Sequence, residues 1–432
     1  MDKIKLAIVC HFSNPKVREH LPLDNRKLYS IVRRILLMPN KGRGYGDIAP
    51  WDSYMVEQLR QRDDIELYVI SAHTGLKRGV CSFELEGVHY HFVRCDRATL
   101  LKRLIPSPSL WHKLNPMRPV IRRLVKKISP DIIALMGTEN AYYSGTVLGI
   151  EGIPIIIKLQ TIYNNPDRAV FSTVDKKNAY VERLLLKSAK YVSAGAKMHY
   201  RLVRQMNPNV YNFKWSFGYI YPDVHPEEKK FDFVNFAMAM DPRKGFPDSI
   251  QALAIVKKEF PNVTLDLVGG GTKEYKEELI QMVESLGLHD NVTFTPFFEK
   301  QEDMFQHIQS ARFVVLPCKM DSVSGTMVQA MHYGFPMICY RTAGTPKLNE
   351  NKECVLIAEN SNVEDLAEKM LLLLRDPQKA NELSINAREY SSVRWDDNDR
   401  IRKQMVDNFR AVIENYRNGT PIPEDLLCDE KK

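Results

Sequence analysis

Several features that define common classes of protein are scarce in this sequence of 432 residues. Its seven cysteines are scattered and form no CxxC pair, so the spacing indicates reduced thiols, neither a disulfide framework nor a zinc motif. No apolar run approaches the length of a membrane span, and the short apolar run near the start lacks a cleavage signal. We therefore expect a cytoplasmic protein, or one bound to the cytoplasmic face of a membrane.

The composition is that of a globular protein, with 44% apolar and 26% charged residues. A chain of this length exceeds one ordinary hydrophobic core, so two domains are expected. No repeat or low-complexity tract interrupts the chain.

Acidic residues are absent from residues 97–127, which hold nine of the Lys and Arg residues of a chain whose net charge is +8. Leucines and Trp111 interleave with these cations over residues 100–111, and such an amphipathic basic stretch can lie on an anionic membrane. The alternative is that the stretch packs against the protein, as we expect for the helix at residues 119–128. Nucleic acid is not an expected partner, because the chain shows no basic-aromatic repeat or reading helix.

Buried strands alternate with helical stretches in both halves of the chain. The strands expected in the first half are residues 6–9, 65–71, 88–93, 132–136, 153–159 and 191–194. Those expected in the second half are residues 233–238, 263–268, 292–294, 313–316, 336–340 and 355–357. Continuous apolar strands separated by amphipathic helices are typical of parallel sheets that are covered on both faces.

A turn-rich segment at residues 217–232 separates the two halves. We expect an N-terminal domain over residues 1–222 and a C-terminal domain over residues 223–390. A last helix is expected within residues 391–418, followed by a frayed polar tail at residues 419–432.

Residues 318–346 form the most informative stretch. A buried strand precedes a polar loop, a helix begins near Gly325 and stops at Gly334, and a second buried strand follows. The unpaired N–H groups at the start of this helix predict an anion site at the carboxyl edge of the sheet. The alternative is an ordinary strand–helix turn without a ligand.

This stretch resembles the Glu-x₇-Glu signature of the retaining family 4 glycosyltransferases. Asp321 stands in the place of the first acid and Gln329 in the place of the second, eight positions later. The resemblance implies that Asp321 holds sugar hydroxyls and that Gln329 holds the ribose without a charge. The counterparts of the Gly-rich turn, of EAM and of GxPV are Ser324-Gly325-Thr326, Gln329-Ala330-Met331 and Gly334-Phe335-Pro336-Met337.

Two further motifs of the second half resemble donor-binding elements of this family. Lys244-Gly245 matches its GR…KG element, whose Lys neutralises the leaving diphosphate; Ala239 stands where the family has Arg, and Arg243 is expected to substitute. The alternative is a surface turn with solvated charges. Gly270 lies in a triple glycine that resembles the VGxG turn, where the backbone approaches the nucleotide.

Three positions of the first half are candidates for the acceptor or sugar side. Gly44 lies in a Gly-rich loop, which is either the family's closing loop or a surface loop. Glu139 follows a strand and would bind acceptor or donor hydroxyls. Gln160 stands where many family members have a histidine. We expect His199 to be an ordinary histidine on a helix surface.

The resemblance implies the GT-B fold: two doubly wound, Rossmann-like parallel-sheet domains that face a cleft. It also implies a retaining hexosyltransferase, which moves a sugar from a nucleotide-diphosphate sugar to a hydroxyl acceptor. The basic amphipathic stretches favour a saccharide or lipid-linked saccharide of surface polysaccharide synthesis as that acceptor. Lys244, Arg243 and the amides of Gly325 and Thr326 would stabilise the leaving diphosphate. No Asp-x-Asp motif stands at a strand end, so we expect no metal and no other cofactor besides the donor as co-substrate.

Two alternatives belong to other classes of function. The altered positions Asp321, Gln329, Ala239 and Gln160 favour a non-catalytic scaffold or regulatory partner of the same fold. A nucleotide-sugar epimerase or hydrolase of this fold would need a cluster of acids and histidines, and the sequence indicates none.

Overall fold

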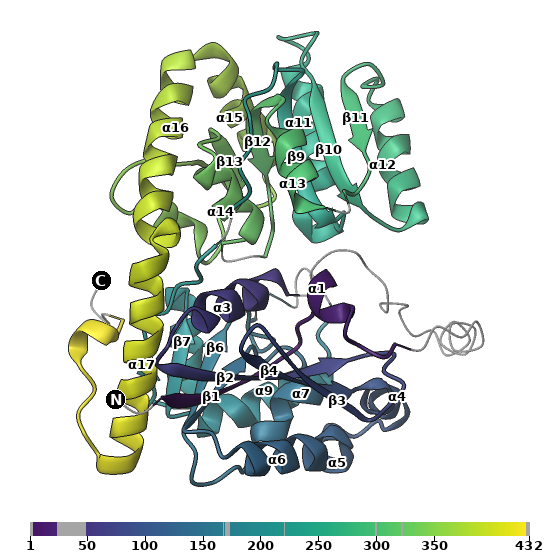
Figure 1. Ribbon diagram of the computed structural model, residues 1–432. Coiled ribbons are helices and arrows are strands. Elements are labelled where there is room, and N and C mark those ends of the chain that lie inside the picture. Colours follow the sequence, from purple (N-terminus) through teal and green to yellow (C-terminus); the bar gives the residue numbers. More distant parts are fainter. Residues whose placement is uncertain are drawn as a thin grey trace. The chain divides into compact units, whose positions relative to one another are not determined.

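The computed structural model describes residues 3–23, 49–166, 168, 173–219, 221–298, 300–320 and 323–428. The chain forms two units, one of residues 1–219 with 398–432 and one of residues 220–397. The chain therefore crosses between the units twice, at residues 219–220 and 397–398, where the sequence predicts domain ends at 222 and 390 (Figure 1).

Unit 1 is built on an eight-stranded sheet with the order β3-β4-β2-β1-β5-β6-β7-β8. All described pairs are parallel except β3 with β4, which is antiparallel. The strands are β1 (Ile4–Cys10), β2 (Ile65–His73), β3 (Val80–Leu85), β4 (Val88–Arg94), β5 (Ile132–Met136), β6 (Ile155–Leu159), β7 (Tyr191–Ala194) and β8 (Tyr211–Asn212). The edge strand β3 escapes the sequence analysis because polar and apolar residues alternate in it over a half-exposed surface.

Helices cover both faces of this sheet. Side chains of a strand alternate between its two faces, so a strand that is apolar throughout presents apolar side chains to helices on both. Leu6 and Ile8 of β1 belong to one apolar cluster and Ala7 and Val9 to another. Helix α3 contributes to the first cluster, and α6 and α9 to the second (Figure 1). The helices are α1 (Pro15–Arg18), α3 (Pro50–Arg60), α4 (Asp96–Leu104), α5 (Pro108–Leu114), α6 (Met117–Ile128), α7 (Ala141–Ser144), α9 (Lys176–Ser188) and α10 (Lys197–Met206).

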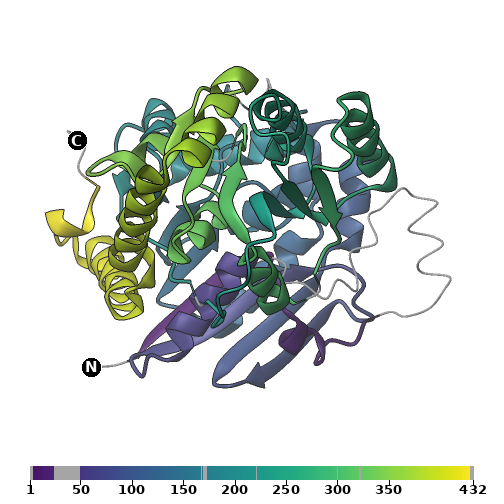
Figure 2. The same ribbon diagram turned by 90° about the horizontal axis from the view of Figure 1, so that it is seen from above.

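The last helix, α17 (Asn398–Asn418), belongs to unit 1 although its sequence follows unit 2. Met405, Phe409 and Val412 are buried in the same cluster as Leu6 of β1. The segment after α17 folds back beside it (Figures 1 and 2). The prediction of a frayed tail is wrong up to residue 428, because Ile422 and Leu426 are buried and Cys428 N–H donates to the Asn212 carbonyl at 2.8 Å.

Unit 2 is built on a six-stranded parallel sheet with the order β11-β10-β9-β12-β13-β14. Renumbered within the unit, this is the 3-2-1-4-5-6 order of the Rossmann fold. The strands are β9 (Phe231–Ala239), β10 (Leu265–Gly270), β11 (Val292–Thr295), β12 (Ala311–Leu316), β13 (Met337–Tyr340) and β14 (Leu356–Ala358). The prediction of two Rossmann-like domains is thus confirmed.

Apolar side chains of α11 and α15 pack together with strand residues such as Phe233, Leu265 and Ile338 in the core of unit 2. The helices are α11 (Phe246–Val256), α12 (Lys273–Ser285), α13 (Gln301–Ile308), α14 (Gly325–His332), α15 (Val363–Arg375) and α16 (Pro377–Ser391), and a π-helical turn at Ser392–Asp396 follows α16. The sequence analysis missed α13 and α16.

Candidate functional site

In the sheet of unit 2, β9 and β12 are neighbours, but the chain leads from β9 to β10 in one direction and from β12 to β13 in the other. The topological switch point of the sheet therefore lies between β9 and β12. At such a point the segments that follow the two strands diverge and leave a crevice at the carboxyl edge, where ligands of open α/β sheets bind. The segments that follow β9 and β12 hold Lys244 and Gly325, which the sequence analysis selected independently.

Lys244 closes a short 3₁₀ turn, Pro242–Lys244, directly after β9. Asp241 caps this turn by accepting a hydrogen bond from Arg243 N–H at 2.9 Å. The Arg243 guanidinium also donates two hydrogen bonds, of 2.8 and 2.7 Å, to the Asp241 carboxylate, and this pairing lowers the pKa of Asp241. Because Asp241 compensates the charge of Arg243, Lys244 carries the net positive charge of the turn.

The turn of Lys244 is fixed to the segment that follows β12. Arg243 accepts a hydrogen bond from Lys319 N–H at 2.9 Å. Gly245 has a φ of +70°, and a Cβ there would overlap the carbonyl oxygen of Pro317. Only glycine therefore allows this close approach, which brings the cationic turn against the loop that leads to α14.

Helix α14 begins at Gly325 with Ser324 as its N-cap, whose side chain accepts from Met327 N–H at 3.3 Å. The hydroxyls of Ser324 and Thr326 lie 2.8 Å apart. A Cβ built on Gly325 would meet no atom of the described chain within 4 Å, so the described residues leave the Gly325 end of α14 open. Gln329 lies one turn further along the helix and is buried.

Gly270 ends β10 at the same edge of the sheet, next to a bulge in the pairing of β10 with β9. Its carbonyl accepts from Met240 N–H, and a Cβ on Gly270 would lie 3.3 Å from Cβ of Phe297. The Phe297 side chain is 40% exposed, so an apolar ring borders this backbone. Asp321 and Gly44 lie outside the described residues.

Unit 1 has its own switch point, between β1 and β5. Glu139 follows β5, and burial raises the pKa of its carboxyl to about 7. Within the described chain its Oε2 atom has no hydrogen-bond partner. The Tyr142 hydroxyl, on α7, contacts Nδ1 of His11, which follows β1. The edge of unit 1 thus offers a carboxyl group that titrates near neutral pH.

Asp52 is a fully buried acid of unit 1 that the sequence analysis missed. Burial, followed by the charge of Glu139, raises its pKa well above the usual range. Its Oδ1 atom also lacks a hydrogen-bond partner among the residues that the structure describes. An acid in the first turn of a helix is an ordinary feature, so no pattern along the chain distinguishes Asp52 from other acids.

Glu182 forms hydrogen bonds with the loop that follows β6, and Gln160 lies in this loop. Its buried carboxylate accepts from the Thr138 hydroxyl at 2.8 Å and from the N–H groups of Tyr163 and Asn164 at 3.0 and 2.8 Å. These bonds link the loop that holds Gln160 to the segment that holds Glu139. Glu182 therefore joins the two segments in which the positions proposed for the sugar side lie.

The prediction for His199 is wrong. The side chain is buried on α10 rather than exposed, and desolvation lowers its pKa to about 4. The period of α10 places this position on the face that packs on the sheet, since Val203, four residues later, is also buried.

The basic segment of unit 1 divides into a packed part and an exposed part. Trp111 is fully buried and donates to the Ala98 carbonyl at 3.3 Å, and Lys102 pairs with Asp175 at 2.9 Å. In contrast, three leucines of α4 and α5 are solvent-exposed: Leu104 at 65%, Leu110 at 48% and Leu114 at 54%. Arg103 and Lys113 next to them are exposed as well.

Neither a helix that could span a membrane nor a cluster that could hold a metal ion occurs among the described residues. No described helix is both long and apolar enough to cross a bilayer. The described His, Cys, Asp and Glu side chains form no group of three that could hold a metal ion.

Known proteins share both the sequence pattern and the fold. The family described as Glycosyl transferases group 1 matches residues 220–390. A GDP-mannose-dependent alpha-(1-6)-phosphatidylinositol monomannoside mannosyltransferase of Mycolicibacterium smegmatis is 26% identical over 161 residues, which are 36% of this chain and 41% of that protein. The N-acetyl-alpha-D-glucosaminyl L-malate synthase of Bacillus anthracis is 25% identical over 178 residues, 41% of this chain and 44% of that protein. The chain thus matches less than half the length of these relatives.

Solved structures resemble the chain over nearly its full length. Sucrose-phosphate synthase from Thermosynechococcus elongatus has a TM-score of 0.65 at 17% identity and covers 94% of this chain and 98% of its own. HepE from Anabaena, solved in complex with UDP, has a TM-score of 0.62 at 17% identity and covers 94% of this chain and 100% of its own. The chain therefore has the GT-B fold, and its residues 220–390 carry the sequence pattern of the glycosyl transferases group 1 family.

Proposed function

We propose that the protein is a retaining glycosyltransferase that moves a hexose from a nucleotide-diphosphate sugar to a hydroxyl acceptor. One observation carries this proposal: the turn of Lys244 is hydrogen-bonded to the loop that leads to the open Gly325 end of α14. A diphosphate held there would meet an ammonium group and unpaired backbone N–H groups together.

The chemistry that we propose depends on charge that develops in the transition state. As the bond from the sugar to the diphosphate breaks, negative charge grows on the leaving oxygen, and fixed donors at Lys244, Gly325 and Thr326 would stabilise it. Arg243 would contribute through the turn that it forms with Asp241. Since Lys244 and the N–H groups at the start of α14 would offset charge on the diphosphate, we propose that no metal is required, and turnover should persist in EDTA.

The remaining contacts are proposed from the resemblance and from the geometry of each unit. Gly270 would allow the nucleotide to approach the backbone, with Ser324 and Gln329 nearby on the α14 side and Asp321 on the sugar hydroxyls. In unit 1, Glu139 and Gln160 would bind sugar or acceptor hydroxyls, supported by the unpartnered oxygen of Glu139. The relatives named for GDP-mannose, and the neighbour solved with UDP, support a nucleotide-sugar donor.

The acceptor that we propose is a lipid-linked saccharide of surface polysaccharide synthesis, reached from the cytoplasmic face of a membrane. The support is the exposed leucines of α4 and α5 beside Arg103 and Lys113. Such a combination of apolar and cationic side chains favours an anionic bilayer surface.

The first prediction tests the donor chemistry. Purified protein is incubated with UDP- and GDP-linked hexoses, and release of the nucleoside diphosphate is measured with and without a lipid-linked saccharide extract. Lys244→Ala should lower turnover about 100-fold or more, as loss of one preorganised donor does in other enzymes. Lys258→Ala, which removes an exposed cation just after α11, is the control and should leave the rate unchanged.

Other outcomes distinguish the alternatives. Nucleotide release that yields only free sugar, even with acceptor present, would indicate a hydrolase. Binding without turnover across the whole panel would indicate a scaffold. The anomeric configuration of the product, read by NMR, tests retention.

A further inference from the structure

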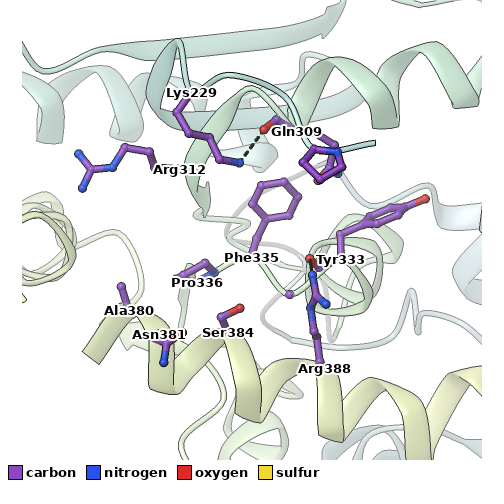
Figure 3. A pocket seen from close by; sticks show the side chains of 12 residues that line it. Lys229, Gln309, Arg312, Tyr333, Phe335, Pro336, Ala380, Asn381, Ser384 and Arg388 are labelled. Carbon is purple, nitrogen blue, oxygen red and sulfur yellow. Dashed lines mark hydrogen bonds between the residues drawn. The ribbon is translucent and has the colours of Figure 1, made fainter. Parts of the chain in front are cut away.

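A pocket of about 340 Å³ lies in unit 2, away from the candidate donor site (Figure 3). It adjoins the start of β12, where Arg312 is the second residue, and Pro336, which directly precedes β13. Because the strands are parallel, their starts lie at the edge opposite to Lys244 and Gly325, roughly 20 Å away for a strand of this length. The pocket is therefore a separate feature.

The charged groups of this pocket have one sign. Lys229, Arg312 and Arg388 line it, and none of its lining residues is acidic. Lys229 lies on one side of the Phe335 ring and Arg388 on the other, whereas the Arg312 guanidinium points away from the ring, as Figure 3 shows. Two of the cations have internal partners: Lys229 Nζ donates to the Gln309 carbonyl at 2.6 Å, and Arg312 pairs with Asp232 at 2.8 Å.

Arg388 differs from these two cations. Its Nη2 donates to the Tyr333 carbonyl at 3.0 Å, and no carboxylate of the described residues lies within 4.0 Å of its guanidinium. The guanidinium group lies across Gly334, whose φ is +73° and where a Cβ would overlap Arg388 Nε. Arg388 is thus held in place by backbone contacts, and most of its donors remain available.

The other residues that line the pocket suit a small polar molecule. Phe335 and Pro336 form an apolar floor, and Ser384 lies one turn of α16 before Arg388, so its hydroxyl and the guanidinium lie on one helix face. The volume is at the lower end of the range of small-molecule sites. The pocket has room for a phosphate group joined to a molecule the size of a monosaccharide, but for little more.

We propose that this pocket binds a phosphate monoester of a small polyhydroxylated molecule, such as a sugar phosphate. The planar fork of Arg388 would bind two phosphate oxygens, and Lys229, whose partners are neutral carbonyl groups, would add positive potential from the opposite side, while Asp232 compensates the charge of Arg312. The Ser384 hydroxyl would bind the body of the ligand. The ligand would contact α16 and the segment at Lys229, through which the chain enters and leaves unit 2.

Isothermal titration of the full chain with glucose 6-phosphate and with inorganic phosphate tests this site. We expect saturable binding of glucose 6-phosphate at millimolar concentrations and at least about threefold weaker binding of phosphate. Arg388→Gln should weaken binding about tenfold or more, because it removes a bidentate, charge-assisted contact. Lys273→Gln, a change to an exposed cation of α12, should have no effect.

The donor site is excluded by a second control. Lys244→Ala should leave the binding of glucose 6-phosphate intact, whatever its effect on turnover. If Arg388→Gln lowers the melting temperature, Arg388→Lys decides, because it keeps the charge and loses the fork; it should still weaken binding. Absence of saturable binding, equal affinity for phosphate and ester, unchanged binding in both Arg388 variants, or loss of binding in Lys244→Ala would each overturn the proposal.

Discussion

Among single residues, Glu139 has a protonation state that couples most directly to stability near neutral pH. Its carboxyl ionises near pH 4.5 in the unfolded chain but at about 7 in the buried site, because burial disfavours the charge. Between these pH values the folded state holds one more proton than the unfolded state, so the free energy of unfolding falls as pH rises. The loss is complete above pH 7 and amounts to at most about 3 kcal/mol.

The second prediction follows from this sign. Glu139→Gln should raise the melting temperature of unit 1 at pH 8 relative to the wild-type protein, and the difference should shrink towards pH 5. Differential scanning calorimetry across this range measures it, with the exposed Glu151, which precedes β6, changed to Gln as the control. A pH-independent difference between Glu139→Gln and the wild type would contradict the assigned ionisation.

At the scale of elements, the attachment of α17 to unit 1 includes an aromatic contact in the core. Phe409 is fully buried, and its ring packs edge-on against Trp215 with the centroids 5.4 Å apart. The third prediction is that Phe409→Ala lowers the unfolding free energy of unit 1 by about 3–5 kcal/mol, the usual range for such a cavity. Chemical denaturation followed by Trp fluorescence measures the change.

The control for this change lies on the same helix. Lys403 is mostly exposed, so Lys403→Ala should alter the stability by less than about 0.5 kcal/mol. Equal effects of the two substitutions would mean that α17 contributes little to the core of unit 1.

The elements that the sequence predicts well are those with strong apolar periodicity. The buried strands and the helix after Gly325 are of this kind, and their positions alone indicate the anion site. Helix α16 was missed because its buried positions are few and two of them are alanines, although Asp376 and Pro377 are ordinary helix-start signals. The burial of His199 was misjudged and the packing of Trp111 was left open, because each residue lies in a basic segment where burial depends on contacts distant in sequence.

The candidate site was predictable where it depends on local order along the chain. Lys244 and Gly325 each follow a strand, and parallel strands place such segments at one edge. The pairing of Arg243 with Asp241, the buried Asp52 and the pocket at Arg388 were not predictable, because each depends on side-chain geometry or on residues brought together by the sheet.

At the scale of the whole molecule, the net charge of +8 and the exposed leucines of α4 and α5 bear on membrane binding. The fourth prediction is that the protein floats with liposomes that contain anionic lipid, and that Arg103→Glu with Lys113→Glu lowers the bound fraction. Each basic residue near such a surface contributes about 1 kcal/mol, so the affinity should fall at least about tenfold.

A matched double change in unit 2, Lys258→Glu with Lys273→Glu, alters the net charge equally and should leave flotation nearly unchanged. Equal loss in both double variants would indicate attraction by overall charge alone. Unchanged flotation of the Arg103 and Lys113 variant would show that the exposed part of α4 and α5 does not bind the membrane.

The most direct test of the central claim is a crystal structure of the protein soaked separately with UDP and with GDP. We predict that one of them binds at the switch point of β9 and β12, with its diphosphate oxygens within hydrogen-bonding distance of Lys244 Nζ and of the Gly325 or Thr326 N–H group. A nucleotide bound elsewhere, or a Lys244 ammonium directed away from the diphosphate, would contradict the account.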